Sequence, residues 1–234
     1  MTTSRIFGIA AIAAVFALAI LPAQAQDVRR IDGPVLGFSV DQAAGIRPIL
    51  GLPGAATLGP PVISAEGLES VTLSPARDYA LALLASGRAV VLLKNLRSTA
   101  GASVLDIAAG PARIAISPSG DAAVLYYAET ARLQVLAGLP ESPAVSWSVD
   151  LSGRSGVGAL AVSDGGGAVL VASAGEPAAV WLVTQAAGQR ILYTAAGSVS
   201  LAFLVGSQDA AIADGAAGAV VLVRDPAEIG RAHV

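Results

Sequence analysis

Four aspartates recur at intervals of forty-odd residues, each in or beside a polar turn: Asp78, Asp121, Asp164 and Asp209. If the turns lie on one face of the molecule, these carboxylates could form a polar rim for a ligand or a calcium site. Aspartate is also a common turn former, because its carboxylate accepts hydrogen bonds from nearby backbone N–H groups. The sequence holds no Asp-x-Asp-x-Asp-Gly calcium loop. We therefore predict no catalytic, metal-binding or cofactor-binding residue, and keep the four aspartates as candidates for a polar rim.

The rest of the composition excludes several kinds of catalytic and binding site. The 234 residues include no cysteine and one histidine, His233, next to the last residue. A cysteine nucleophile or zinc ligand is therefore excluded, and so is a Ser-His-Asp triad if His233 is not native. The net charge is −3 and only 4% of the residues are aromatic, so there is neither a basic surface nor a stacking platform for nucleic acid.

The elements that would position the aspartates repeat along the chain. Four segments, starting at Val71, Ile114, Leu160 and Leu201, each read as an apolar strand, a polar turn, a second strand, a small-residue turn and a third strand. Their matching positions are Ser74, Ser117, Ser163 and Leu204, which are 43, 46 and 41 residues apart. A fourth strand fits the connections, for example at Ala102 to Ile107 and Trp147 to Leu151.

Local chemistry supports these strands and turns. Proline follows Ser74 and Ser117, where its fixed φ suits a turn, and glycine at positions such as 120 and 165 tolerates the positive φ of tight hairpins. The strand from Ala122 to Tyr127 is almost continuously apolar, which is typical of a sheet covered on both faces. We expect Tyr126, Tyr127 and Trp181 to pack in the core.

A repeat of 40 to 45 residues with four strands is typical of β-propeller blades. The pattern Ser-Pro-x-Gly-Asp-x-Ala-x-Val, best kept from Ser117 onward, resembles the blades of YVTN-type and WD40-like bacterial propellers. The resemblance covers residues 68–223 and implies an all-β fold, a β-propeller of four-stranded antiparallel blades. Because the chain stops after the third strand of its last repeat, we expect the propeller to be partial and truncated. We expect residues 68–227 to form about four blades, the last incomplete. A β-sandwich is the alternative.

The N-terminus has the features of a signal peptide. Arg5 precedes an apolar run from Ile6 to Leu21, and Ala23-Gln24-Ala25 is a small-x-small cleavage site. The run of about 16 residues is shorter than the roughly 20 needed to cross a bilayer as a helix. We therefore predict that residues 1–25 form a signal helix that is cleaved before Gln26, and that contact with a membrane is limited to this peptide before cleavage.

Two further segments differ from the repeats. Within residues 26–67, the stretches Val35 to Val40 and Ile46 to Leu50 predict a hairpin that could supply ring-closing strands. Residues 228–234 resemble the translation of a common sequencing adapter, which suggests a non-native tail and a longer natural protein.

Together these features predict an exported protein, periplasmic or extracellular, that acts as a non-catalytic scaffold at the cell envelope. Its partner would be an unknown protein or envelope ligand, with no nucleic acid and no cofactor. The alternative is a propeller enzyme, lactonase-like or another hydrolase, whose site is completed by missing C-terminal blades.

Overall fold

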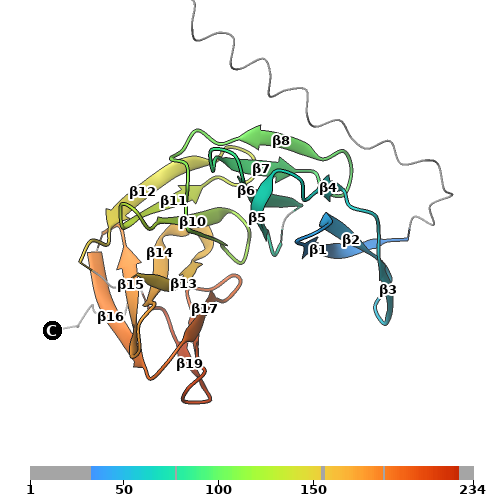
Figure 1. Ribbon diagram of the computed structural model, residues 1–234. Coiled ribbons are helices and arrows are strands. Elements are labelled where there is room, and N and C mark those ends of the chain that lie inside the picture. The colour runs from blue at the N-terminus through green and yellow to red at the C-terminus, as the bar shows by residue number, and fades with distance from the viewer. Residues whose placement is uncertain (1–32, 77, 154–155, 187, 227–234) are drawn as a thin grey trace, which may run out of the picture. The chain divides into compact units, whose positions relative to one another are not determined.

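The computed structural model describes residues 33–76, 78–153, 156–186 and 188–226. The predicted signal peptide and the predicted non-native tail lie outside these residues. The described chain is all-β and forms five antiparallel sheets, with one three-residue 3₁₀ turn, η2 (Asp164–Gly166). The predicted fold class is confirmed: the sheets have a β-propeller arrangement (Figure 1).

The sheets follow one another in chain order, and the strands of sheets 2 to 5 pair only with their neighbours in sequence. Sheet 1 contains β1 (Val35–Asp41), β2 (Gly45–Leu52), β3 (Ala55–Leu58) and β4 (Ile63–Ser64), with β3 and β4 both paired to β2. Sheet 2 contains β5 (Leu68–Leu73), β6 (Tyr79–Leu84), β7 (Val90–Lys94) and β8 (Gly101–Val104). Sheet 3 contains β9 (Arg113–Ile116), β10 (Ala122–Tyr127), β11 (Arg132–Ala137) and β12 (Ala144–Asp150). Sheet 4 contains β13 (Val157–Val162), β14 (Ala168–Ser173), β15 (Ala178–Thr184) and β16 (Gly188–Ala195), and sheet 5 contains β17 (Val199–Phe203), β18 (Ala210–Asp214) and β19 (Ala219–Val223).

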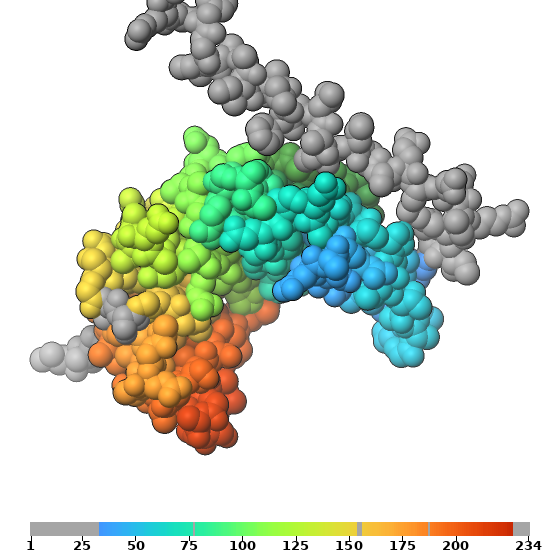
Figure 2. Space-filling model, viewed as in Figure 1, coloured from blue at the N-terminus to red at the C-terminus, as the bar shows by residue number. Residues whose placement is uncertain are grey.

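Each sheet lies against the next one in the chain. The first strands make the contacts in succession, from β1 to β5, β5 to β9, β9 to β13 and β13 to β17. The colours of Figure 2 show the same order over the described residues, from blue at sheet 1 to red at sheet 5. Consecutive packing of this kind is what a repeat must have when one sheet cannot bury its own apolar face.

The second strand of each central sheet sends alternate side chains to opposite neighbours. In β10, Val124 and Tyr126 belong to the apolar cluster shared with sheet 4, whereas Leu125 and Tyr127 belong to the cluster shared with sheet 2. All six residues of β10 are buried. The strand is continuously apolar because successive side chains point to opposite faces and both faces are covered.

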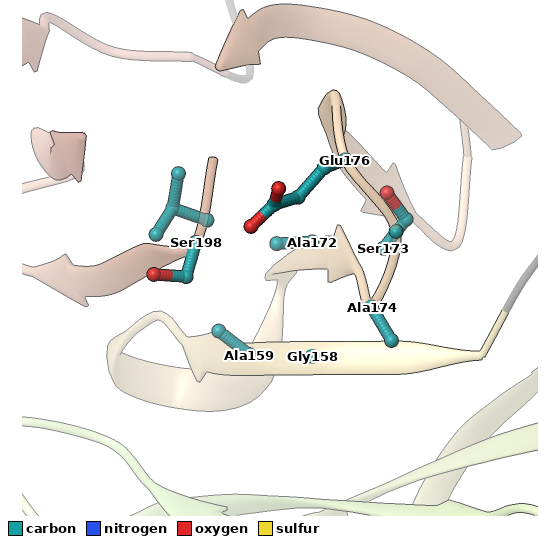
Figure 3. A pocket seen from close by; sticks show the side chains of 9 residues that line it. Gly158, Ala159, Ala172, Ser173, Ala174, Glu176 and Ser198 are labelled. Carbon is teal, nitrogen blue, oxygen red and sulfur yellow. The ribbon is translucent and has the colours of Figure 1, made fainter. Parts of the chain in front are cut away.

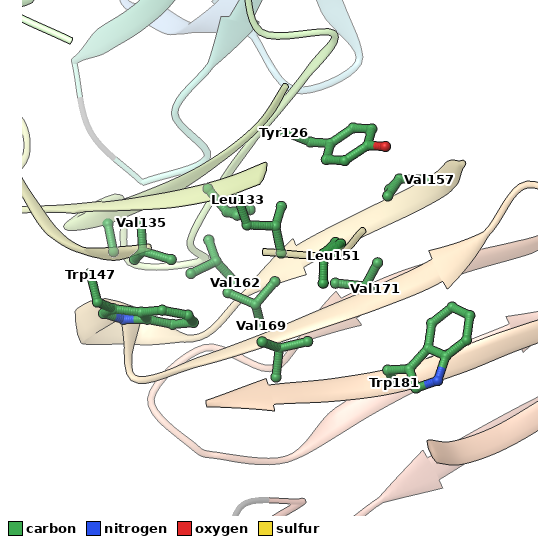
Figure 4. Close-up of a cluster of buried hydrophobic side chains, with 13 residues drawn as sticks. Tyr126, Leu133, Val135, Trp147, Leu151, Val157, Val162, Val169, Val171 and Trp181 are labelled. Atoms are coloured by element: carbon green, nitrogen blue, oxygen red, sulfur yellow. The ribbon is translucent and has the colours of Figure 1, made fainter. Parts of the chain in front are cut away.

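The predicted aromatic core residues are buried as expected. Tyr126, Tyr127 and Trp181 are each less than 9% exposed. Trp147, on β12, is also buried and lies with Trp181 in the cluster between sheets 3 and 4 (Figure 4). Its indole N–H donates a hydrogen bond of 2.9 Å to the carbonyl oxygen of Gly166 in sheet 4, so that the ring is both packed and satisfied.

The four positions aligned from the sequence are equivalent in the structure. In every case the backbone N–H of the aligned residue donates to the carbonyl of the residue five positions later: Ser74 to Tyr79, Ser117 to Ala122, Ser163 to Ala168 and Leu204 to Asp209. Ser117 and Ser163 are fully buried, and their hydroxyl oxygens also accept the N–H of that later residue. The alignment is therefore confirmed at the level of individual hydrogen bonds.

Two details differ from the sequence prediction. The fourth strand of sheet 2 is Gly101–Val104 and stops short of Ile107, because Leu105 turns into the core and Ile107 N–H donates back to its carbonyl. The fourth strand of sheet 3 begins earlier than Trp147, at Ala144, and ends at Asp150.

The segment before residue 68 contains the predicted hairpin. This hairpin, β1 with β2, pairs in register Val40–Ile46 and belongs to a sheet of its own with β3 and β4. In the described residues it does not pair with β17–β19, and its role as ring-closing strands stays a prediction. The repeat segment from residue 68 onward contains the other four sheets, and sheet 5 has three described strands.

Because the strands of each repeat are antiparallel, its turns fall at two ends. We call one end the aspartate face; it carries the turns between first and second strands, at residues 74–78, 117–121, 163–167 and 204–209. We call the other end the loop face; it carries the turns between second and third strands and the connections from one sheet to the next. Among the described residues, no helix has the length and apolar character needed to cross a membrane.

Candidate functional site

On the aspartate face, Asp121 and Asp164 join neighbouring sheets by a reciprocal exchange of hydrogen bonds. The carboxylate of Asp121 in sheet 3 accepts the N–H of Gly165 in sheet 4 at 3.0 Å. In return, Asp164 Oδ1 accepts the N–H of Ser119 in sheet 3 at 2.8 Å. Asp164 Oδ2 accepts a third N–H, from Gly206 in sheet 5, at 3.1 Å. Asp164 therefore connects three consecutive sheets through one carboxylate.

The other two candidates act within their own sheets. Both oxygens of Asp78 accept the N–H of Arg97, just after the third strand of sheet 2. Asp209 Oδ1 accepts the N–H of Asp225, just after the third strand of sheet 5. All four carboxylates thus accept backbone N–H groups, but from residues 16 to 45 positions away in the sequence and not from their own turns. The further role of a ligand rim stays a prediction.

The ionisation of Asp121 reflects these contacts. Burial of the side chain acts to raise its pKa, but hydrogen bonds from Gly165, Ser119 and Ser117 outweigh burial and hold the pKa below its ordinary value.

The turn of sheet 4 that contains Gly166 also packs closely against sheet 3. A Cβ added at Gly166, where φ is +75°, would lie 2.8 Å from Val135 Cγ1 and 3.3 Å from Ala122 Cβ of sheet 3. This position requires glycine both for its positive φ and for the close approach of its backbone to sheet 3.

The loop face carries an open depression of about 100 Å³ between sheets 4 and 5. Figure 3 shows its side chains: Glu176 extends from the turn between β14 and β15, above Ala172, toward Ser198 at the start of β17. The lining is formed by small residues and one carboxylate: Gly158, Ala159, Ala172, Ser173, Ala174, Gly175, Glu176, Ser198 and Val199.

The local sequence explains the depression. The pairing of β13 with β14 shifts register between Val157 and Ala159, so Gly158 forms a bulge in the first strand. A Cβ at Gly158 would lie 2.8 Å from the carbonyl oxygen of Ser173, so only glycine fits there. In sequence the glycine-rich segment 153–158 indicates an inter-blade loop, but β13 already begins at Val157. Gly158, in this strand, lines the depression.

Asp214 stabilises the wall of the depression that is formed by Ser198 and Val199. This carboxylate is 2% exposed and accepts the N–H groups of Ala216 and Ala217 in its own turn and of Ala196 in the connection that leads to Ser198. The hydrogen bond from Ala217 is the main reason that the pKa of Asp214 lies below its ordinary value. Tyr193 donates its hydroxyl to the same carboxylate, which raises the pKa of Tyr193.

Most of the residues that line the depression are uncharged. Glu176 is its only titratable side chain. In the described part of the chain, no three His, Cys, Asp or Glu side chains form a group that could hold a metal ion. Sequence reasoning missed this site, because Gly175-Glu176-Pro177 looks like any polar turn. The interruption of the apolar strand by Gly158 was the one available signal.

Comparison with known proteins agrees with the architecture. No protein-family model matches the chain, and no match to a curated protein was found. A chain in the crystal structure of a nidogen/laminin complex is similar with a TM-score of 0.54 and 13% identity, over 83% of this chain and 74% of that chain. At this identity the likeness shows the fold alone.

Two weaker structural likenesses are with proteins of Myceliophteria thermophila and Chaetomium thermophilum. The β-propeller domain of Myceliophteria thermophila Cps50 (Swd1) has a TM-score of 0.46 and 10% identity, over 80% of this chain and 78% of that chain. Chaetomium thermophilum Sqt1, bound to the N-terminus of ribosomal protein L10, has a TM-score of 0.48 and 17% identity, over 80% of this chain and 58% of that chain.

Proposed function

We propose that this protein is an exported, non-catalytic β-propeller scaffold that binds a protein or another ligand at the cell envelope through its loop face. One observation carries the proposal. The repeated carboxylates of the aspartate face accept backbone N–H groups, whereas the loop face has a depression with a carboxylate that makes no hydrogen bond or ion pair with a described residue. A scaffold of this kind uses a rigid set of sheets to present variable loops.

Binding through the loop face can be tested by site-specific photo-crosslinking in intact cells. A photoreactive residue would replace Ala174, exposed on the loop face, or Val205, which is 73% exposed on the aspartate face. We expect a discrete crosslinked product from position 174 and none from position 205. No product from position 174, or a product from position 205 alone, would contradict the proposal.

Export is supported by the sequence of residues 1–25, with the basic residue, apolar run and cleavage site in the required order. Mass spectrometry of the protein made from the full reading frame in a bacterial host tests it. The mature chain should begin at Gln26 and be recovered outside the cytoplasm. Full-length chain in the cytoplasm would rule out this part of the proposal.

We also propose a relationship to the YVTN-type bacterial repeats, on the basis of the segment from Ser117 to Val124. The structure gives the motif residues definite roles: the serine hydroxyl closes the turn, and the aspartate bonds to the next sheet. No observation in the described residues favours the alternative of a propeller hydrolase.

A further inference from the structure

Glu176 is the charged group of the loop face that most needs an explanation. It is exposed, lines the depression between sheets 4 and 5, and makes no hydrogen bond or ion pair with any described residue. The two ion pairs among the described side chains are elsewhere, at Arg47 with Asp41 and at Arg88 with Glu69. The carboxylate is thus available for a cation from outside the chain.

The space beside Glu176 suits a long, thin side chain. Its lining includes the apolar side chains of Ala159, Ala172 and Val199, none larger than valine. Gly197 keeps one side open, since a Cβ there would lie 3.0 Å from Ala216 Cβ and 3.8 Å from Glu176 Oε1. A methylene stem could lie along this surface while its charged end meets the carboxylate.

Hydrogen bonds within the protein hold the walls of the depression without a ligand. Ser173 Oγ accepts the N–H of Ala179 and so anchors the end of β14 to β15. On the other side, the N–H of Gly215 donates to the carbonyl oxygen of Ser198, and Asp214 holds Ala196. Rigid walls reduce the entropy lost on binding, which favours recognition of even a single side chain.

We propose that this depression is a binding site for a basic side chain, lysine or arginine, of a protein ligand. Both side chains combine an apolar stem with a cationic head, and this combination matches a small apolar floor beside one unpaired carboxylate. The inference rests on the proposed function, because it names the partner chemistry of the same loop face.

A matched pair of small probes tests the chemistry. The probes are Nα-acetyl-lysine N-methylamide and its norleucine analogue, which keeps the stem and lacks the charge. Titration into the ¹⁵N-labelled protein should give saturable shifts of the Gly158, Gly175 and Ser198 amides with lysine, with affinity on the order of millimolar. The norleucine probe should give much smaller shifts, and added salt should weaken lysine binding.

Two variants complete the experiment. E176Q should weaken lysine binding about two- to fivefold, the range expected for loss of one exposed ion pair. E129Q is the control: Glu129 is exposed in the corresponding turn of sheet 3 and does not line the depression, so binding should not change. Equal binding of both probes, equal binding by E176Q and the wild type, or no saturable shift would overturn the inference. If one of these results were found together with a crosslink from position 174, the depression would not bind a basic side chain, but the proposed function would stand. Absence of that crosslink would instead count against the proposed function.

Discussion

At the scale of single residues, the four aspartates occupy similar places in the sequence repeat but form two kinds of hydrogen bond. Asp121 and Asp164 bond across sheet boundaries, whereas Asp78 and Asp209 bond within their sheets. The recurrence of aspartate was visible in the sequence, and so was its suitability for turns. Which carboxylate reaches a neighbouring sheet depends on sheet packing, and the spacing of residues along the chain does not contain that information.

We predict that D164A lowers the free energy of unfolding by about 1–3 kcal/mol, because two backbone N–H groups in different sheets lose a charged acceptor. Chemical denaturation monitored by fluorescence measures the change. D106A is the control, since Asp106 is exposed and makes no hydrogen bond within the described chain. Equal stability of the two variants would show that the bridge contributes nothing.

Stability should also depend on pH through Asp121. Because the pKa of Asp121 in the folded protein lies below its ordinary value of 3.8, the unfolded chain binds more protons as the pH falls through this region. The stabilisation is therefore present above about pH 3.8 and is lost as the pH falls below it. Asp41, Asp150 and Asp214, whose pKa values are also lowered, contribute in the same direction.

Denaturation midpoints measured at pH 5 and in steps down to pH 2.5 would isolate the contribution of Asp121. D121N should be less stable than the wild type at pH 5, and the difference should shrink as the pH falls. A constant difference across this range would mean that the charge of Asp121 is not what stabilises the turn.

At the scale of elements, the central strands follow from the sequence more fully than the edges do. Continuous apolar runs such as Ala122 to Tyr127 predict burial on both faces, and the structure shows alternate side chains packed against two different sheets. The outer strands were placed less accurately, because they are short and partly exposed, as at Gly101–Val104. Sheet 1 carries no repeat motif, so only its hairpin could be predicted.

The packing of β10 gives a direct test. Leu125 is fully buried between sheets 2 and 3, so L125A should lower the free energy of unfolding by about 2–5 kcal/mol through lost contacts and a residual cavity. Leu222, on β19, is 52% exposed, and L222A should change stability by less than about 0.5 kcal/mol. The two variants remove the same atoms, so a similar loss in both would contradict the assigned burial.

The depression on the loop face belongs to this scale as well, and the sequence did not reveal it. It depends on the bulge at Gly158 and on the connection through Gly197, both of which matter only after sheets 4 and 5 have packed together. The small residues that line the depression do not indicate a binding site in the sequence. Glu176 stands out only in the structure, because it has no ion-pair partner among the described residues.

At the scale of the whole molecule, the sheets stand side by side in chain order, and sheets 3, 4 and 5 are joined on one face by Asp121 and Asp164. The opposite face carries the connections between sheets and is the face for which we propose binding. The repeat predicted this arrangement because its units recur at similar intervals and each has apolar strands on both sides of its turns. The ligand could not be predicted, because repeats specify architecture and leave the loops variable.

Amide hydrogen exchange by NMR, with wild-type protein and D164A compared, tests this arrangement most directly. Ser119 and Gly206 lie 87 positions apart and in different sheets, yet both donate to Asp164. Both amides should be protected in the wild type and both should lose protection in D164A, while the amide of Ala122, bonded to Ser117 Oγ, should stay protected. If protection at Ser119 and Gly206 were absent in the wild type, or unchanged in D164A, the proposed order of sheets and their connection through this aspartate would be wrong.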